Sequence, residues 1–488
     1  MELKELKPVL IWNLFDRITK VPRPSKKEEK IVDFLLDFAK AHHLHAKKDK
    51  ALNVIMTKPA TPGKEHLQTL ILQSHVDMVC EKNNDQVFNF ETDAIQTRVE
   101  GDWVKANGTT LGADDGIGMA AALALLTATD IEHGPLVALF TTDEETGLTG
   151  ANALDPSFLQ GDILLNLDSE EWGEFCIGCA GGKNTIGTFT YQAENAPAGY
   201  FWFEVRISNL KGGHSGSDIH KELGNANRIL ARYLYELSKE CPVVLSKIDG
   251  GNLHNAIARE ASAVAGVPAA SKEAACVLLN VLQAELLNEL PAEDRKVQLS
   301  IHSAAAPASS IDRTTGNRLI SALYALPHGV MGWSFDMPGT VETSTNLASV
   351  KMKEDCTIVV TTSQRSSTAS SKADVVNKVT SVFRLAGADV RSTEGYPGWK
   401  PNPSSPILQV SEQVFRKLFG EKPQVISIHA GLECGLFLEK NPRLDMISCG
   451  PTVLGAHSPE ERLEIPTVEK WWNFLVELLK NIPAQTHS

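Results

Sequence analysis

Four segments decide the fold of this chain: ILQSHVDMV (71–79), TTLGADDGIGMA (109–120), LVALFTTDEETG (136–147) and DILLNLDSE (162–170). Each segment places histidine or carboxylate side chains at the end of an apolar run or just beyond it. Apolar runs of this kind predict buried strands, and the sequence between them is typical of helices and loops. Because ligands bind where the strands of an open α/β sheet end, we expect the polar residues to collect at one edge.

The residues that would collect at this edge are mainly acidic. Histidine and several carboxylates would lie together without a balancing run of Lys or Arg. Carboxylates that lie this close repel one another unless a cation lies among them. A metal site is therefore the simplest explanation of the pattern.

The composition limits the classes of partner. With 488 residues the chain is too long for one core of ordinary size, so two domains are expected. The fractions of hydrophobic residues (42%) and charged residues (22%) are those of a soluble globular protein. The net charge of −13 argues against nucleic acid or an anionic membrane surface as partner. Small molecules or peptides remain.

The sequence also predicts a cytoplasmic location. The first twenty residues alternate charged and apolar side chains and lack the continuous apolar core of a signal peptide. No run of about eighteen apolar residues, as a membrane-spanning helix needs, occurs in the chain. Eight scattered cysteines fit reduced thiols in the cytosol better than a disulfide framework.

The first part of the chain alternates predicted strands and helices. We expect helices over 26–41, 116–127 and 150–158 and strands over 51–57, 68–74, 136–142 and 162–167, the first two strands forming a pair. After Gly182 the pattern changes to strand pairs between helices. There we expect strands over 200–209, 242–249, 261–267, 297–302, 330–336, 341–352 and 356–364 and helices over 218–238, 271–290, 311–325 and 371–386.

This second pattern predicts an α+β unit with an antiparallel sheet and helices on one face. A proline-dense segment over 396–406 then leads back to the first pattern, with helices over 407–419 and 467–481 and strands over 424–428 and 444–448. We therefore predict an α/β protein with a discontinuous catalytic domain, residues 1–186 and 401–488. Its sheet would be mixed, mostly parallel and flanked by helices, and residues 187–400 would form an inserted α+β domain.

Coordination chemistry suggests roles for the acidic residues. Each motif alone also suits an ordinary structural role, such as a helix N-cap, a solvated acidic turn or a capped strand end. Four motifs in order, each at the end of a predicted strand, favour a two-metal hydrolase. Asp114 would bridge two metals about 3.5–4 Å apart, with His75 and Asp168 on one and Glu145 and His457 on the other.

Two further residues complete this predicted centre. Asp77 lies two positions after His75, on the same side of the strand, and would accept the second ring N–H of that histidine. Glu144 lies beside a predicted ligand without being one. It would be the general base that deprotonates the shared water and then protonates the leaving amine.

These motifs resemble those of a known family. His75-Val-Asp77, Gly112-Ala-Asp-Asp-Gly116, Asp143-Glu-Glu145, Asp168-Ser-Glu170 and the late His457 are similar to the dizinc metallopeptidases that include aminoacylases, glutamate carboxypeptidase and bacterial dipeptidases. Gly212-Gly-His-Ser-Gly216, Asn252-Leu-His-Asn-Ala-Ile257 and His429-Ala-Gly-Leu-Glu433 most resemble the branch that cleaves Xaa-His dipeptides, including β-Ala-His.

The resemblance implies further properties of the chain. It implies two Zn²⁺ per subunit, although Co²⁺ or Mn²⁺ also suit this ligand set. A cis peptide bond is implied between Asp114 and Asp115. The inserted domain is expected to act as a lid and as the contact surface of a homodimer.

In the inserted domain, the resemblance assigns roles to three residues. His214 would stabilise the oxyanion, in some relatives from across a dimer, and Asn255 and Arg365 would hold the C-terminal carboxylate of the substrate. Gly431, which follows the inserted domain, would offer backbone contacts. The forked guanidinium of an arginine suits a carboxylate, although Arg365 also fits the ordinary role of a surface arginine at a strand end.

The expected activity is hydrolysis of dipeptides, preferentially Xaa-His. A tripeptidase or an N-acyl amino acid deacylase of the same family is the enzymatic alternative. A binding protein that keeps the metal fold without turnover is the alternative from another class, and the presence of Glu144 argues against it.

Overall fold

The computed structural model describes residues 3–485, which divide into two compact units. Among these residues, unit 1 comprises 3–178, 401–427 and 432–485, and unit 2 comprises 179–400 and 428–431. The predicted domain boundary at residue 187 falls inside strand β9 (Gly181–Thr190), which pairs with other strands of unit 2 along its whole length.

Unit 1 is built on an eight-stranded mixed sheet with the order β1-β2-β6-β3-β7-β21-β8-β20. The strands are β1 (His45–Lys48), β2 (Val54–Lys58), β3 (Leu70–His75), β6 (Leu136–Thr141), β7 (Ile163–Asn166), β8 (Glu174–Cys179), β20 (Gln424–Ile428) and β21 (Asp445–Ser448). The central strands β6, β3, β7 and β21 run parallel, whereas the pairs β1–β2, β2–β6 and β21–β8 are antiparallel. The predicted α/β class with a mixed sheet is confirmed.

One predicted pairing is wrong. Strands β2 and β3 follow each other in sequence, but β6 lies between them, antiparallel to β2 and parallel to β3. All six residues of β6 are buried, so this strand needs a partner on each edge and cover on each face. A central place in the sheet supplies both.

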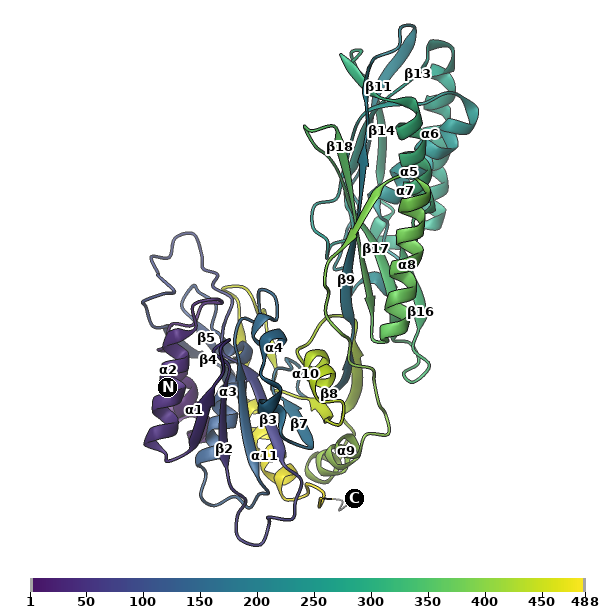
Figure 1. The fold of residues 1–488 in the computed structure, drawn as a ribbon. Helices are drawn as coiled ribbons and strands as arrows, with labels where there is room; N and C mark the ends of the chain where they lie inside the picture. The colour runs from purple at the N-terminus through teal and green to yellow at the C-terminus, as the bar shows by residue number, and fades with distance from the viewer. Residues whose placement is uncertain (1–2, 486–488) are drawn as a thin grey trace. The chain divides into compact units, whose positions relative to one another are not determined.

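The helices of unit 1 pack against this sheet and against one another (Figure 1). They are α1 (Val9–Ile18), α2 (Glu29–Ala41), α3 (Ala113–Thr127), α4 (Thr149–Ala153), α9 (Pro406–Phe419), α10 (Cys434–Lys440) and α11 (Ile465–Leu479). Helix α3 is rich in Ala and Gly and is buried nearly all round, against α1, β3 and β6. Small side chains let these backbones approach closely, which fixes the start of α3 beside the ends of the parallel strands.

A smaller four-stranded sheet completes unit 1. Its order is β22-β23-β5-β4, with β4 (Thr97–Glu100), β5 (Trp103–Ala106), β22 (Val453–Leu454) and β23 (Arg462–Glu464). The pairing of β23 with β5 is antiparallel and joins the end of the chain to its first third. Residues 455–461, which include His457, form the connection between β22 and β23.

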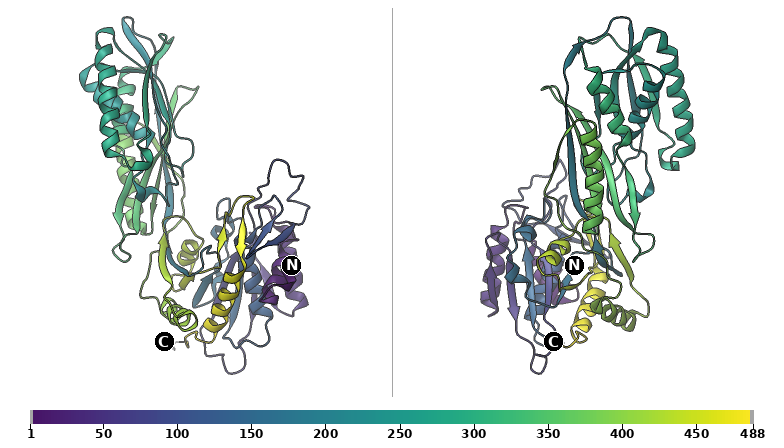
Figure 2. Two further views of the ribbon diagram at one scale, coloured as in Figure 1. Left: turned by 180° about the vertical axis from the view of Figure 1, so that it is seen from behind. Right: turned by 45° about the vertical axis from the view of Figure 1, so that its right-hand side comes forward.

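Unit 2 is an antiparallel sheet with its helices on one face (Figures 1 and 2). The sheet order is β14-β11-β13-β12-β17-β18-β9-β19, and β16 also pairs with β17. The strands are β9, β11 (Tyr200–Ser208), β12 (Val244–Gly250), β13 (Ala261–Pro268), β14 (Gln298–Ser303), β16 (Gly329–Trp333), β17 (Val341–Met352), β18 (Thr357–Ser366) and β19 (Asp389–Ser392). The short strands β10 (Ala193–Asn195) and β15 (Ser309–Ile311) form a separate pair.

The helices of unit 2 are α5 (Ala226–Glu240), α6 (Lys272–Glu289), α7 (Arg313–Ala325) and α8 (Ala369–Leu385). The predicted helix over 218–238 begins later, because Asn225 caps α5 by accepting the backbone N–H groups of Asn227 and Arg228. The apolar side chains between these helices and the sheet form one continuous core.

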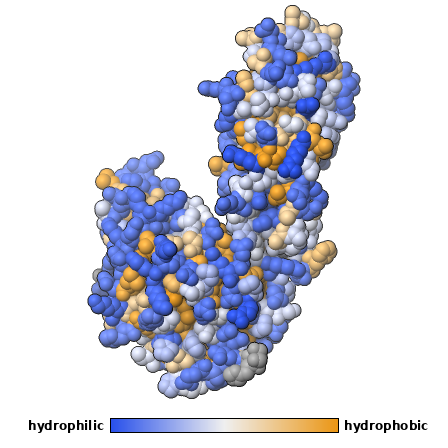
Figure 3. Space-filling model, in the orientation of Figure 1, coloured by the Kyte–Doolittle hydropathy of each residue, from blue (hydrophilic) through white to orange (hydrophobic). Residues whose placement is uncertain are grey.

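Among residues 3–485, no helix combines the length and the apolar character that crossing a membrane requires. The surface drawn in Figure 3 is mostly hydrophilic, and its apolar residues lie in separate patches.

Candidate metal centre

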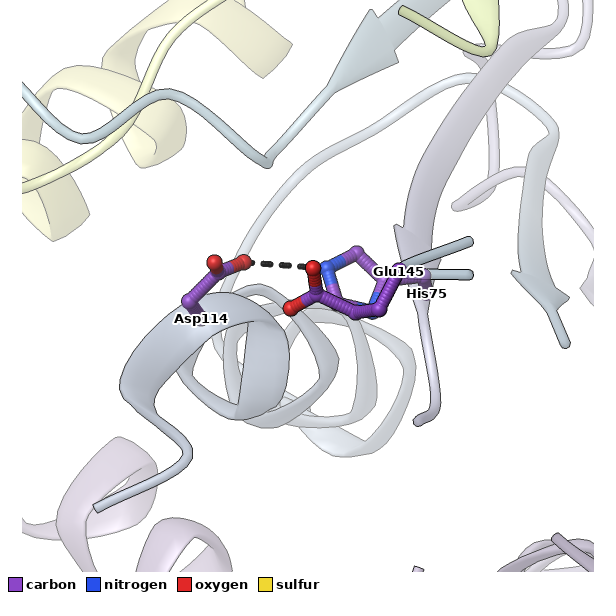
Figure 4. Close-up of side chains that lie close together, drawn as sticks. All are labelled: His75, Asp114 and Glu145. Atoms are coloured by element: carbon purple, nitrogen blue, oxygen red, sulfur yellow. Dashed lines mark hydrogen bonds and ion pairs between the residues drawn. The ribbon is translucent and has the colours of Figure 1, made fainter. Parts of the chain in front are cut away.

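Three side chains from distant parts of the sequence meet at the ends of the parallel strands of unit 1 (Figure 4). His75 ends β3, Asp114 lies in the first turn of α3, and Glu145 lies in the turn after β6. One ligand atom from each lies within 4.8 Å of the others. The strand order explains the meeting, because β3 and β6 are parallel neighbours and therefore end at the same edge.

The carboxylate of Asp114 lies between two histidines, with one oxygen directed at each. Its Oδ1 lies 2.9 Å from Nε2 of His75, and its Oδ2 lies 3.1 Å from Nε2 of His457. Each histidine also faces a second carboxylate: Nε2 of His75 lies 3.5 Å from Asp168 Oδ1, and Nε2 of His457 lies 3.0 Å from Glu145 Oε2. The five residues therefore form two half-sites that share Asp114.

The donor set fits a pair of divalent cations. Each half-site supplies one imidazole nitrogen and one carboxylate, with the shared carboxylate as a third ligand, and such sets bind Zn²⁺, Co²⁺ or Mn²⁺. Glu145 Oε1 is buried and has no hydrogen-bond donor among residues 3–485. A buried carboxylate oxygen of this kind is costly unless a cation or donor reaches it.

Asp77 holds the groups around this cluster in place. Its carboxylate is fully buried, and Oδ1 lies 3.4 Å from Nδ1 of His75. The same carboxylate accepts the backbone N–H groups of Glu144 and Glu145 at 3.0 and 3.3 Å and the hydroxyl of Ser25 at 2.8 Å. One carboxylate thus orients the His75 ring and the turn that carries two consecutive glutamates.

In unit 2, Arg365 is buried at the end of β18 with 6% of its surface exposed. Its Nη1 donates to the hydroxyl of Tyr396 at 3.1 Å, and its buried Nε–H has no acceptor among the described residues. A Cβ atom on Gly431 would lie 2.8 Å from the ring of Tyr396. The glycine therefore leaves room for the tyrosine that supports the guanidinium.

His214 lies in a turn of unit 2 and bridges to Ala256 of the segment that carries Asn255. Its Nδ1 accepts the backbone N–H of Ser217 at 3.1 Å, so the neutral ring carries its proton on Nε2. Burial and the charge of Arg365 lower the pKa of His214. The backbone carbonyl of Asn255 accepts the N–H of Ser215 at 2.8 Å, which ties the two turns together.

The model of peptidase family M20/M25/M40 matches residues 71–481 of this chain. The chain belongs to this family. The resemblance inferred from the motifs is thereby confirmed, and the chain is a hydrolase that acts on peptide bonds. The peptide bond between Asp114 and Asp115 is cis, as that resemblance implied.

Individual relatives of the M20 family cover the whole chain. The chain is 42% identical over 484 residues to the cytosol non-specific dipeptidase of Escherichia coli (strain K12). This match covers 99% of this chain and 100% of the relative. The crystal structure of the aminoacylhistidine dipeptidase from Vibrio alginolyticus matches with a TM-score of 0.95 at 41% identity, over 100% of this chain and 99% of that one. A tripeptidase from Staphylococcus aureus shares the fold, with a TM-score of 0.55 at 17% identity over 98% and 99% of the two chains.

Two residues that support the centre were missed from the sequence. Arg23 is buried and donates to the carbonyls of Val76, Asp77 and Gly112. Glu461 is buried and accepts the backbone N–H groups of the turn before Asp114. A charged residue between two prolines, and a second acid close after His457, are the only sequence signals of these roles.

The cluster shifts the pKa of its own members. Burial raises the pKa of the Glu144 carboxyl to about 8, against the charge of His75 and with help from the carboxylates around it. Hydrogen bonds to Asp114 and Glu145 raise the pKa of His457 to about 11. In the protein without cations, these carboxylates therefore hold a proton on the His457 ring across the neutral range.

This proton predicts a pH dependence of metal binding. A cation binds only the unprotonated ring of His457. Because the pKa of this ring is raised to about 11, the cation must displace a proton at neutral pH. Apparent affinity for Zn²⁺ should therefore fall as the pH falls, and binding at about pH 7 should release protons. Calorimetric titration in buffers of different ionisation enthalpy measures this release. A heat of binding that is the same in all buffers would contradict it.

Proposed function

We propose that this chain is a dinuclear metallodipeptidase that hydrolyses the amide bond of dipeptides with a free amino end, preferentially Xaa-His. The observation that carries the proposal is the carboxylate of Asp114, whose two oxygens face the two histidines of two half-sites. The names of two full-length relatives support dipeptides as substrates, one of them naming aminoacylhistidine and the other a non-specific range.

We assign the first half-site to His75 and Asp168 and the second to Glu145 and His457, with Asp114 as the bridge. Two Zn²⁺ are the proposed cations, with Co²⁺ or Mn²⁺ as alternatives. Bound at these residues, such cations would polarise the peptide carbonyl and lower the pKa of the attacking water. The site residues of the chain orient the cations and handle the protons.

Glu144 is the proposed general base. Its backbone N–H is held by Asp77, and its side chain makes no hydrogen bond among the residues that the structure describes. A carboxylate that is placed beside the ligands but is not one of them can accept the proton of the attacking water. It then gives this proton to the amine that leaves when the C–N bond breaks.

The residues of unit 2 are proposed to bind the C-terminal carboxylate of the substrate and the oxygen that becomes negatively charged during the reaction. Arg365 keeps donors free because Tyr396 occupies only Nη1. His214 presents Nε2–H, which suits an oxygen that gains negative charge during the reaction. The side chain of Asn255 would be a further donor toward the carboxylate, and Gly431 would offer backbone contacts while leaving room for Tyr396.

The setting of the enzyme follows from its relatives. We propose a cytosolic enzyme, because the name of the Escherichia coli relative places that protein in the cytosol. A homodimer formed through the inserted domain is proposed from the resemblance of the motifs.

The substrate class is tested with the full chain loaded with Zn²⁺, Co²⁺ or Mn²⁺. The panel consists of Ala-His, β-Ala-His, Ala-Ala, Ala-Ala-His and N-acetyl-histidine, and the readout is kcat/KM. We expect dipeptides to be cleaved and the Xaa-His pair to be preferred. A higher value for the tripeptide or the acyl amino acid would favour a tripeptidase or a deacylase, and no turnover with bound metal would favour a binding protein.

Replacing Glu144 tests the general base. Glu144→Gln keeps the size of the side chain but cannot accept the proton, so kcat should fall by about 10²- to 10⁴-fold while two cations stay bound. Elemental analysis and steady-state kinetics measure the two quantities. Glu145→Gln is the matched comparison, since it removes a proposed ligand and should lose metal as well. Activity near that of the wild type in Glu144→Gln would refute the role.

Replacing Arg365 tests the carboxylate site. Arg365→Ala should raise KM for Ala-His by about ten- to a hundredfold, because a hydrogen-bonded ion pair is lost. It should change KM for Ala-His amide much less, since the amide offers no charge to pair. The exposed Arg391 on β19 provides the control Arg391→Ala. Equal losses on the acid and the amide would show that Arg365 has only a structural role.

A further inference from the structure

The turn that presents Asp114 is held by one buried carboxylate from the far end of the chain. Oε2 of Glu461 accepts the backbone N–H groups of Leu111 and Gly112 at 2.7 and 2.9 Å. Its Oε1 accepts those of Ala113 and Asp114 at 2.7 and 3.3 Å. Four successive N–H groups therefore converge on a single side chain, which is 2% exposed.

This arrangement requires an acceptor-only carboxylate. All four neighbours of the two oxygens are N–H donors, so a protonated carboxyl would direct its O–H at a donor. The residue at the start of α3 is Gly112, which has no side chain to cap these groups. Glu461 accepts the N–H groups of residues 111–114, whereas Asp115 accepts that of Gly118, as a local helix cap does.

Arg23 holds the same turn from the carbonyl side. Its guanidinium is 1% exposed and donates to the carbonyl of Gly112 and to those of Val76 and Asp77. The positive charge of Arg23 and the negative charge of Glu461 are thus both buried around one short loop. A buried charge is costly unless it is paired and hydrogen-bonded, and here Arg23 donates three hydrogen bonds and Glu461 accepts four.

Glu461 also belongs to the segment that carries His457. The connection from β22 to β23 includes both residues, and the N–H of Glu461 donates to the carbonyl of Ser458 at 3.0 Å. The four hydrogen bonds to residues 111–114 therefore tie the turn of Asp114 to the turn of His457. These are the two residues whose side chains meet at 3.1 Å.

We propose that Glu461 is a positioning residue of the dinuclear centre, which sets the bridging carboxylate of Asp114 and the ring of His457 in register for two divalent cations. The inference rests on the proposed function. Glu461 contacts neither substrate nor cation and acts through the backbone of the turn. Removing such support weakens metal binding even where the ligands themselves are intact.

The test uses Co²⁺ titration of the full chain after metal removal. Glu461→Gln keeps the length of the side chain but turns one acceptor oxygen into an N–H₂ group that faces backbone N–H donors. We expect the affinity for the second Co²⁺ to fall by about ten- to a hundredfold and the visible absorption of the bound Co²⁺ to change. Glu460→Gln is the matched control, because the neighbouring Glu460 is exposed, and it should bind as the wild type does.

The outcomes separate positioning from general stability. If Glu461→Gln lowers only the melting temperature of the metal-free protein and binds two Co²⁺ with the affinity and spectrum of the wild type, the proposal is overturned. Should that variant fail to fold, Glu461→Asp decides, since it keeps the charge and withdraws the oxygens; binding like that of the wild type would again overturn the proposal. A wild-type protein that binds fewer than two Co²⁺ would contradict the proposed function instead.

Discussion

The repulsion among buried carboxylates is the constraint on which unit 1 depends. Asp114, Glu145 and Asp168 lie around two histidines at the edge where β3, β6 and β7 end. Such groups are driven apart unless opposite charge lies among them or the backbone around them is firmly held. Three features fix the backbone around these groups: the parallel centre of the sheet, the buried helix α3, and the buried side chains of Arg23 and Glu461. The same hold is what a site for two cations requires, because ligands must be in place before binding.

The two units carry opposite charges where their proposed site residues lie. The cluster of unit 1 is rich in carboxylates. In unit 2, burial and then the positive charge of Arg365 lower the pKa of three histidines: His214, His254 and His429. A dipeptide has an ammonium group at one end and a carboxylate at the other. In the proposed function, Arg365 would pair with this carboxylate, whereas the ammonium group is what an acylated amino acid lacks.

Much of the fold follows from local sequence patterns. Continuous apolar runs before His75, Glu145 and Asp168 identified the parallel strands, because strands covered on both faces need no polar alternation. The order of strands is not local information, and the insertion of β6 between β2 and β3 could not be read from either segment. The pattern of the sequence changes after Gly182, close to the start of unit 2 at residue 179, yet the predicted boundary at 187 lies within β9.

The side chains at the site were predictable to different degrees. Histidine and carboxylates after apolar strands have a chemical reason to be there, so the five proposed ligands were named from sequence and the structure brings them together. Arg23 and Glu461 form hydrogen bonds with backbone carbonyl and N–H groups. Because nearly every residue has such groups, the sequence does not show which ones these side chains contact. The partners of Glu461 lie 350 to 347 positions away in sequence. Nothing in the composition of the turn at 111–114 indicates which carboxylate it needs.

The adjacency of Glu144 and Glu145 shows how one short turn can serve two tasks. Two consecutive glutamates would be expected to compete for the same cation, yet only Glu145 reaches His457, at 3.0 Å. Asp77 accepts the N–H groups of both residues, one on each oxygen, and so holds the backbone of the turn that carries them. Burial raises the pKa of the Glu144 carboxyl, which lies beside the proposed ligands, to about 8. A carboxyl whose pKa is raised toward the neutral range can both take up a proton and give it back, as the proposed general base requires.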